Sequence, residues 1–367
     1  MPPLGPTEID AELGEVHYKG DVALEERYTD EIIDVIKRAT EKRFGERVRP
    51  ARRDAHAFDT ACVQAIFRVD PNLHPDLRQG VFVPGREYAA WIRFSNGNCV
   101  ETSPRAPDAR GMAIKLMGIS GDKLMSDEKE TQDFILISHP RFFVDDLKPY
   151  KATLDRFLRG RFWDQWVVAP LKLGSLRSIA IAFRVNALFV TNPLFIRYWS
   201  MTPYRLGLDP ARKLAVKYAV KPQGEKPPFF RRLAAFFGRG FAQKKEIAAR
   251  LAGAEMRFDF YIQRYIDART PIEDSTVEWP ERVSKLERVA EIVIPAQAII
   301  SPERDRFCDN LSFSPWHGLP EHKPLGLVNR VRRRVYLSIS EHRHALNEVA
   351  PQEPTCSANA PGCPFGG

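Results

Sequence analysis

The segment YAAWIRFS, residues Tyr88–Ser95, decides the fold class predicted for this chain. Every second residue from Ala90 to Phe94 is apolar, which is the period-two pattern of a β-strand that buries one face. Similar alternation or short apolar runs occur in four later segments, Phe134–Ile137, Leu214–Val220, Phe258–Ile262 and Val289–Ile294. Many strands of this kind, joined by turns rich in Gly, Pro and Asn, predict a closed or rolled antiparallel sheet.

Helical patterns surround the predicted sheet. Apolar residues spaced for one helical face predict a helix over Asp30–Arg43, after an extended arm formed by residues 1–27. Further helices are predicted over Lys151–Trp166, Gly238–Ala254 and Arg330–Asn347, the last of which ends before a Pro-rich tail. We therefore expect an α+β fold, an antiparallel β-barrel with inserted and C-terminal helices. Its parts are an N-terminal arm and helix (residues 1–44), a main domain (45–347) and a flexible tail (348–367).

The composition is that of a soluble globular protein, with 44% hydrophobic and 28% charged residues. The 55 Lys and Arg residues against 47 Asp and Glu give a formal net charge of +8. An excess of this size favours an acidic membrane surface, nucleic acid or an anionic ligand, or it simply keeps the protein soluble. The most apolar region, Ile179–Trp199, has Val185–Ile196 as its longest charge-free run, which is shorter than the roughly 20 residues of a membrane-spanning helix.

The N-terminus and the five cysteines indicate a cytoplasmic protein. The N-terminal residues lack the basic start and apolar stretch of a secretory signal. Cys62, Cys99 and Cys308 are scattered without the spacing of a zinc site. Cys356 and Cys363 lie in the Pro/Gly/Ala-rich tail, where they can pair or stay free. This pattern predicts a reducing compartment and no structural disulfide framework.

A second basic feature is the segment Lys226–Lys245, which interleaves five phenylalanines with basic residues. Such a composition suits a peripheral membrane contact, where apolar side chains enter the interface and cations meet lipid phosphates. The alternative is a helix packed on the barrel with a solvated basic face. Nucleic-acid binding is not expected, because the basic residues form no broader motif.

The predicted late helix carries a tyrosine between two arginines. Arg332 lies one turn before Tyr336 and Arg343 lies two turns after it, so all three side chains project from one helical face. A guanidinium one turn away stabilises a phenolate, and a ferric ion would complete the deprotonation. Tyrosine is a known haem ligand, and the second arginine could hold a propionate. The alternative is a tyrosine packed against arginines on a surface helix.

Two earlier motifs offer partners for such a ligand. In RRDAHAF, Arg53 and His56 are three residues apart, and a histidine can take a proton from a hydroperoxide and return it to the leaving oxygen. The alternative is a structural histidine. In IRFSNGN, Arg93 and Ser95 share one strand face; an arginine directed into a barrel is costly unless it meets an anion, and Ser95 could fix the tautomer of the histidine. Asp108 and Arg110 are expected to form a fold-stabilising pair.

Taken together these motifs resemble the haem catalases. RxxH at Arg53–His56, RFS at Arg93–Ser95, DxRGxAxK at Asp108–Lys115 and RxxxY at Arg332–Tyr336 occur in the order of that family. The stretch FSPWHGLPEHKPLG, Phe313–Gly326, is similar to a shorter branch that includes small catalase-related peroxidases and hydroperoxide isomerases. The similarity spans roughly residues 45–347.

The resemblance implies a catalase-like barrel and a haem b site. Tyr336 would be the iron ligand, kept ionised by Arg332, and His56 would be the distal acid–base residue, supported by Ser95. The propionates would be bound by Arg53, Arg93 and Arg343. Phe143 falls where the family places an aromatic ring over the distal face of the haem.

The chain also departs from the family pattern. Counting back from Pro140, the distal asparagine of catalases falls on Thr131, whose hydroxyl donates only one hydrogen bond where an amide donates two. The N-terminal arm is short, and the chain ends soon after the tyrosine helix. We therefore expect weak dismutation of hydrogen peroxide and better use of larger hydroperoxides.

The function predicted is that of a haem peroxidase, which reduces organic or lipid hydroperoxides with a small electron donor. One alternative is a hydroperoxide isomerase or lyase similar to allene oxide synthase, although such relatives carry a threonine where Ala55 stands. Another is a non-catalytic haem-binding protein, against which the retained His56 counts. A homo-oligomer is possible, as in other catalase relatives.

Overall fold

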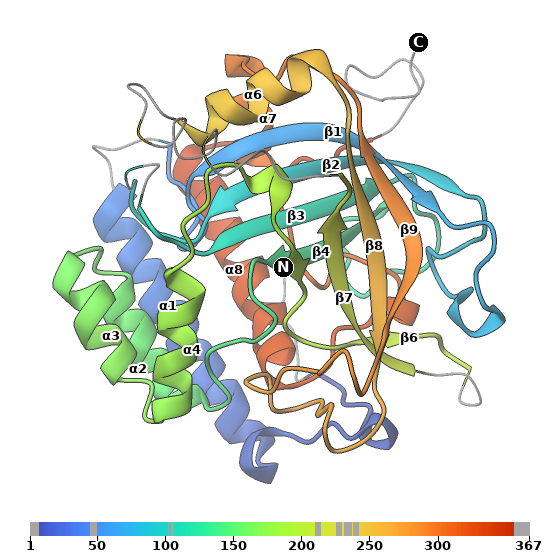
Figure 1. Cartoon of the computed structure of the whole chain (residues 1–367). Helices are drawn as coiled ribbons and strands as arrows, with labels where there is room; N and C mark the ends of the chain where they lie inside the picture. The colour runs from blue at the N-terminus through green and yellow to red at the C-terminus, as the bar shows by residue number, and fades with distance from the viewer. Residues whose placement is uncertain are drawn as a thin grey trace.

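The computed structural model describes residues 7–44, 50–101, 103, 106–209, 214–224, 230, 237 and 242–355. The strands are β1 Asp59–Val69, β2 Glu87–Asn96, β3 Arg110–Met117, β4 Thr131–Ile137, β5 Tyr198–Trp199, β6 Tyr204–Leu206, β7 Leu214–Pro222, β8 Met256–Arg264 and β9 Leu286–Ile294. The α-helices are α1 Val22–Phe44, α2 Leu147–Phe157, α3 Ala169–Leu171, α4 Leu176–Asn186, α6 Gln243–Gly253, α7 Pro302–Asn310 and α8 Leu327–Asn347 (Figure 1). A π-helical turn, Asp164–Val168, leads directly into α3.

The strands form an antiparallel barrel. They pair in the order β5-β4-β3-β2-β1-β9-β8-β7, with β6 added beside β7, and pairing of β5 with β7 closes the ring. The five predicted strand segments lie in β2, β4, β7, β8 and β9, so the predicted barrel is confirmed. Its interior is filled by side chains, with Phe134 and Phe260 ring centroids 4.9 Å apart and Phe67 5.1 Å from Phe260. The barrel is therefore a packed core, and a ligand has to be bound outside it.

Strand β2 gives one face to this core and the other to the outside. Ala90, Ile92 and Phe94 belong to the buried cluster inside the barrel, as the alternation predicted. Arg93 and Ser95 therefore lie on the outer face of the barrel wall. The expectation of an arginine directed into the barrel is wrong. Ile92 and Phe94, the neighbours of Arg93 in the strand, point into the interior, so the side chain of Arg93 points outward.

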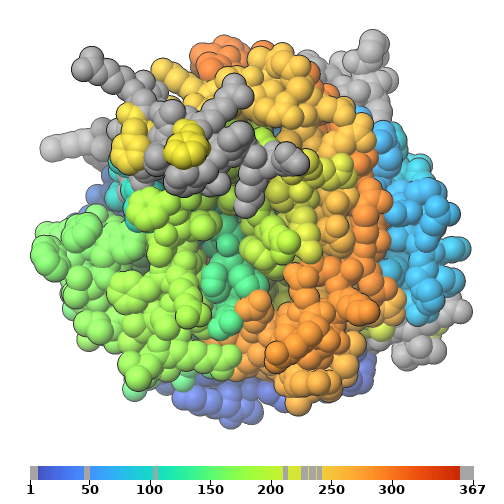
Figure 2. Space-filling model, in the orientation of Figure 1, coloured from blue at the N-terminus to red at the C-terminus, as the bar shows by residue number. Residues whose placement is uncertain are grey.

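Helices cover this outer face. The helices α1, α8 and α2 pack against one another beside β2–β4, and Ile36, Leu154, Val331 and Ile339 belong to one buried cluster between them (Figure 1). The space-filling view in the orientation of Figure 1 shows α2–α4 in green as a mass on the left of the molecule (Figure 2). The site described below lies between this helical layer and the barrel.

Several helix boundaries differ from those predicted, most of all at the start of α1 and the end of α2. Helix α1 begins at Val22, and the residues before it are tied down: Arg330 at the start of α8 contacts Glu15 at 3.0 Å and Glu25 at 2.8 Å. The predicted extended arm is therefore docked on α8 through buried ion pairs at Glu15, before α1, and at Glu25, in its first turn. Helix α2 ends at Phe157 instead of continuing to Trp166, because the chain turns at Gly160 with a positive φ of 71°.

The prediction of no structural disulfide is wrong. Strand β1 and helix α7 pack together, and they are joined by a disulfide between Cys62 and Cys308 across 246 residues of sequence. Cys99 is buried and free, while Cys356 and Cys363 lie outside the described residues. Because the cysteine argument for a reducing compartment assumed unpaired thiols, it no longer holds.

Most of the basic Phe-rich segment Lys226–Lys245 also lies outside the described residues, apart from Phe230, Phe237 and the start of α6. Within the part of the chain that the structure describes, no helix has the length and apolar character needed to cross a membrane.

Candidate functional site

A cavity of about 300 Å³ lies between the outer face of the barrel and the helices α1, α2 and α8. Strands β2, β3 and β4 contribute its floor, and the loop before β1 contributes one wall. Eight of the nine residues singled out from the sequence line it, namely Arg53, His56, Arg93, Ser95, Phe143, Arg332, Tyr336 and Arg343. Segments up to about 290 positions apart in the sequence therefore meet in one enclosed space, whose size falls within the range of small-molecule sites.

His56 is held in one orientation at this cavity. Its Nδ1 lies 3.0 Å from the Oγ of Ser95, as expected, and its backbone carbonyl accepts a hydrogen bond of 2.9 Å from Arg93. The residue adopts a φ of +53°, which costs a non-glycine residue free energy and persists only where the surroundings fix it. A Cβ at Gly111 on β3 would lie 2.7 Å from both the His56 ring and Ser95, so only glycine leaves room for this pair.

The electrostatic surroundings keep His56 neutral. Desolvation at the cavity wall, followed by the nearby positive charge of Arg93 and then Arg332, lowers the pKa of His56 to about 3. A neutral imidazole with Nδ1 engaged by a serine has Nε2 available for proton exchange. The arrangement therefore suits a base that accepts a proton from a ligand within the cavity.

Arg53, Arg93 and Arg343 converge on one end of the cavity, where their hydrogen-bond acceptors are mainly neutral backbone carbonyls. Arg53 donates to the carbonyl oxygen of Leu311, and Arg343 donates to the carbonyl oxygens of Asp309 and Leu311, at the end of α7. Burial and mutual repulsion lower the pKa of Arg93 to about 9 and that of Arg343 to about 8. The buried Nε of Arg93 has no hydrogen-bond partner among the described residues. Such a cluster favours a bound dianion.

Tyr336 faces the same cavity from α8. Its phenol makes no hydrogen bond within the described part of the chain, so its oxygen is available to a ligand. Arg332, one turn earlier, donates to Asn329 at 3.4 Å and lies over the ring of Phe142, with its guanidinium carbon 5.2 Å from the ring centroid. Arg332 therefore stands near Tyr336 on the same helical face without being hydrogen-bonded to it.

The remaining walls are largely apolar. Phe143 stacks on Phe142 with ring centroids 4.6 Å apart, and both rings contact Tyr150 of α2. Aliphatic side chains from β4, α2, α4 and α8 complete the lining, among them Ile135, Leu154, Val185, Val328 and Val335. This lining suits a flat apolar ligand with a few polar groups at its edge.

Two titratable residues of the cavity lining were not predicted from the sequence. Asp54, between Arg53 and His56, lines the cavity, and burial raises the pKa of its carboxyl. Tyr150 lines it from α2, and burial raises the pKa of its phenol. Asp54 lies inside the RxxH motif, so its position was a signal. Tyr150 carries no signal in the sequence.

Thr131 does not line this cavity. It begins β4 opposite Met117, whereas the cavity is bordered by the other end of the strand at Ile135–Ile137. Six residues of strand separate Thr131 from Ile137, a distance of about 20 Å at 3.3 Å per residue. The placement of Thr131 on the distal side is therefore wrong, and the argument from Thr131 for weak dismutation falls with it.

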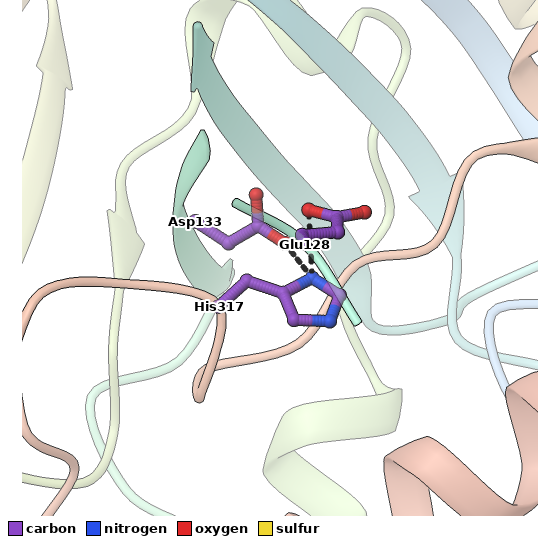
Figure 3. A group of neighbouring side chains, drawn as sticks. All are labelled: Glu128, Asp133 and His317. Atoms are coloured by element: carbon purple, nitrogen blue, oxygen red, sulfur yellow. Dashed lines mark hydrogen bonds and ion pairs between the residues drawn. The ribbon is translucent and has the colours of Figure 1, made fainter. Parts of the chain in front are cut away.

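Thr131 lies instead beside a second, buried group of charged side chains. Figure 3 shows three of them, Glu128, Asp133 and His317. The Thr131 hydroxyl donates to Glu128, and Nδ1 of His317 lies 3.1 Å from Glu128 and 3.0 Å from Asp133. Glu128, Asp133 and His317 are residue types that hold metal ions, but the buried ammonium of Lys115 contacts both carboxylates. Hydrogen bonds to the neighbouring carboxylates also raise the pKa of His317 in spite of its burial, so Lys115 and His317 together balance Glu128 and Asp133. This group therefore acts as an ion network.

This ion network fixes the segment that leads into α8. The amide of Ser314 donates to Asp133 at 2.9 Å, and the Trp316 indole donates to the carbonyl oxygen of Asn329 at 2.7 Å. Through these two hydrogen bonds, the segment Phe313–Gly326 links β4 to α8, the helix that carries Tyr336. On the other side of the barrel wall, Asp108 lies 3.7 Å from Arg110, which confirms the predicted fold-stabilising pair.

The residues of the cavity fit a haem. An anionic edge would meet the orphaned Arg93 Nε together with Arg53 and Arg343, and a planar apolar ring would lie among Phe143, Val328 and Val335. Tyr336 offers a free phenol oxygen, a donor that ferric haem accepts. These features are independent of one another and agree on the same ligand.

Comparison with known proteins bears on the fold. The sequence matches no family model and no curated protein. The structure resembles that of a fungal catalase, with a TM-score of 0.62 and 16% identity over 95% of this chain and 66% of the other. It also resembles catalase A from Saccharomyces cerevisiae, with a TM-score of 0.60 and 17% identity over 82% of this chain and 64% of the other.

A bacterial catalase gives a TM-score of 0.62 and 14% identity, over 99% of this chain and 72% of the other. The chain thus spans about two thirds of the length of the first two catalases, at 66% and 64%. At these identities the likeness concerns the backbone alone. The chain has a catalase fold, an antiparallel barrel with helices packed on its outer face.

Proposed function

We propose that this chain binds haem b through Tyr336 and reduces organic or lipid hydroperoxides at the expense of a small electron donor. The observation that carries the proposal is the convergence of His56, Tyr336 and three arginines on one apolar cavity. Each of these residues has an alternative structural explanation when taken alone. Together they supply a base, an iron ligand and a propionate anchor in one place.

The roles of the chain's own residues follow from their contacts. Haem bound here would supply the redox chemistry of hydroperoxide cleavage. Arg53, Arg93 and Arg343 would hold its propionates, and Tyr336 its iron. His56 would accept the proton of the incoming hydroperoxide and return it to the leaving oxygen, while Ser95 keeps its Nδ1 engaged.

The preference for larger hydroperoxides now rests on the lining of the cavity. Aromatic and aliphatic side chains, including Phe142, Phe157 and Leu173, dominate the walls away from His56. Such walls gain free energy from an acyl or aryl group, at about 25 cal/mol per Å² buried, and gain none from hydrogen peroxide. Thr131 has no part in this preference.

The test is haem reconstitution of the full chain followed by peroxide assays. Tyr336→Phe should lose the iron ligand and the absorption spectrum of the wild type, whereas Tyr150→Phe, a matched change in the same cavity, should keep it. Hydrogen peroxide, cumene hydroperoxide and a fatty-acid hydroperoxide are then compared, each with and without a donor. We expect donor-dependent reduction of the two larger substrates.

Other outcomes identify other functions. Failure of the wild type to bind haem would end the proposal. Donor-independent consumption of the fatty-acid hydroperoxide alone would indicate an isomerase or lyase. Haem binding without turnover of any of the three substrates would indicate a non-catalytic haem protein.

A further inference from the structure

The helical insert Arg161–Phe189, which contains the π-helical turn, α3 and α4, exposes large apolar side chains. Trp163 is 71% exposed, Leu171 65% and Leu176 86%, and Phe162, Phe183 and Phe189 are exposed as well. Phe162 contacts both Trp163 and Trp166, with ring centroids 5.8 and 6.5 Å apart, so the aromatic residues form a cluster. Isolated exposed apolar residues are common, but a concentration of this kind within 29 residues marks a surface that something covers.

Helix α4 carries apolar side chains on its solvent-exposed face as well as on its buried face. Ile181, Ala182 and Val185 are buried and face the body of the protein. On the opposite face, Leu176, Ala180 and Phe183 are exposed although that face of a surface helix is ordinarily polar. The exposed face of α4 thus mixes apolar side chains with the basic side chains of Arg177 and Arg184, which is unusual for a face that meets only water.

The charge of the insert selects the partner. Arg161, Lys172 and Arg184 are exposed, and none has a carboxylate within ion-pair distance among the described residues. The sequence has no Asp or Glu from Gln165 to Leu208. Exposed cations elsewhere are in part paired, as Arg288 is with Asp70 at 2.9 Å and with Asp259 at 2.6 Å, and in part unpaired, as Arg282 is among the described residues. What distinguishes the insert is that its unpaired cations lie among exposed apolar side chains. The insert thus combines apolar side chains with unneutralised cations.

We propose that the helical insert docks on an anionic lipid bilayer. Apolar and aromatic side chains of Trp163, Leu176 and Phe183 would enter the interface, and the cations between them would meet lipid phosphates. A hollow of about 20 Å³ beside Trp166, Pro170 and Phe183 is too small to seat a peptide or a helix, whereas the exposed cations suit lipid phosphates. The docking surface is distinct from the basic Phe-rich segment Lys226–Lys245.

Docking would place the cavity wall on the membrane. The buried sides of the same helices line the cavity through Gln165, Leu173, Ala182 and Val185. An acyl chain leaving the bilayer would therefore meet the site through this helical layer. This delivery role rests on the proposed function, whereas membrane docking does not, because it needs neither haem nor turnover.

The experiment is co-sedimentation of the full chain with vesicles of phosphatidylcholine, with or without phosphatidylglycerol. We expect binding to the anionic vesicles, weakened by salt. Arg161→Gln/Lys172→Gln/Arg184→Gln should lower the partition coefficient by roughly fivefold per neutralised cation, about 100-fold in all. Trp163→Ser/Leu176→Ser/Phe183→Ser should also lose binding.

Matched controls change equally exposed residues elsewhere. Val83→Ser/Ile266→Ser/Ile300→Ser alters three exposed apolar side chains, and Lys129→Gln/Arg282→Gln/Lys285→Gln removes three exposed cations. Both should bind as the wild type does, and thermal unfolding checks that every variant is folded. Quenching of tryptophan fluorescence by brominated lipid should occur in the wild type and fall in Trp163→Phe.

Several results would overturn the proposal. One is equal binding to neutral and anionic vesicles without dependence on salt. Another is binding at the wild-type level by both the triple Gln variant and the triple Ser variant of the insert. Loss of binding only on changing basic residues in Lys226–Lys245 would assign docking to that segment instead. Absence of vesicle binding together with self-association that the insert variants abolish would assign the surface to a second copy of the chain.

Discussion

The Nδ1 of His56 lies 3.0 Å from the Oγ of Ser95, and both side chains rest against the bare backbone of Gly111. His56 and Ser95 are 39 positions apart in the sequence, and strand β3, which pairs with β2, provides the space for them at Gly111. The base of the proposed site is therefore positioned by the absence of a side chain on β3 as much as by its hydrogen bond.

Gly111→Ala should displace His56. The new methyl would lie 2.7 Å from both His56 Nδ1 and Ser95 Oγ, a distance that forces one of them to move. Misplacing a catalytic group by about 1 Å costs on the order of 100-fold in rate, so hydroperoxide turnover should fall by about that factor while haem binding persists. Gly253→Ala, where nothing lies within 4 Å of the added carbon, is the matched control. Unchanged turnover in Gly111→Ala would contradict the assigned role of His56.

The pH dependence of turnover should report the lowered pKa of His56. Burial and Arg93 lower that pKa to about 3, so the imidazole is neutral and able to accept a proton at every pH above about 3. The acidic limb of the kcat/KM profile should therefore lie near pH 3, whereas an ordinary histidine would place it near 6.5. His139→Gln, a change outside the cavity lining, should leave the limb in place, and His56→Gln should remove it. A limb near 6.5 that depends on His56 would refute the prediction.

Thr131→Asn should not increase dismutation of hydrogen peroxide. Thr131 is buried at the far end of β4, where its hydroxyl donates to Glu128, and it lies outside the cavity. The larger amide has no room there and should lower the free energy of unfolding by about 1–3 kcal/mol. Oxygen evolution and chemical denaturation measure the two effects. Faster oxygen evolution by the variant would restore Thr131 to the distal side.

Removing the Cys62–Cys308 disulfide should weaken both the fold and the arginine cluster. The disulfide fixes α7 on β1, and the carbonyl oxygens of Asp309 and Leu311 that follow accept hydrogen bonds from Arg343 and Arg53. Cys62→Ala/Cys308→Ala should lose about 2–5 kcal/mol of stability and bind haem more weakly. Cys99→Ala, which changes a buried free cysteine, is the control. Detection of both thiols as free in the unreduced, denatured chain would contradict the pairing.

Lys115→Met should destabilise the protein strongly without any role for a metal. It removes one of the two cations that face the buried carboxylates of Glu128 and Asp133, and breaking one side of a buried ion group costs about 3–5 kcal/mol. Lys129→Met, an exposed change, should stay within about 0.5 kcal/mol of the wild type in denaturant unfolding. A chelator should leave the wild type unchanged; destabilisation by the chelator would identify the group as a metal site.

Local patterns in the sequence determined the elements and the types of side chain at the site. The alternation in Tyr88–Ser95 required a strand with one buried face, and the one-turn spacing of Arg332 and Tyr336 placed both on one face of α8. Such periodicities are visible because they depend on neighbouring residues and on backbone geometry alone. The same alternation in several segments predicted the barrel, while the resemblance of the motif order to that of haem catalases implied eight of the residues that line the cavity.

Only the tertiary structure decided what depends on contacts between distant segments. The alternation of β2 could not say which face was the interior, so Arg93 was expected to point inward. Counting from Pro140 could not show that Thr131 lies at the other end of β4. The pairing of Cys62 with Cys308 depends on how β1 meets α7 across 246 residues. Each of these follows from register and packing, which are set by side chains that are far apart in the chain and adjacent only in the folded protein.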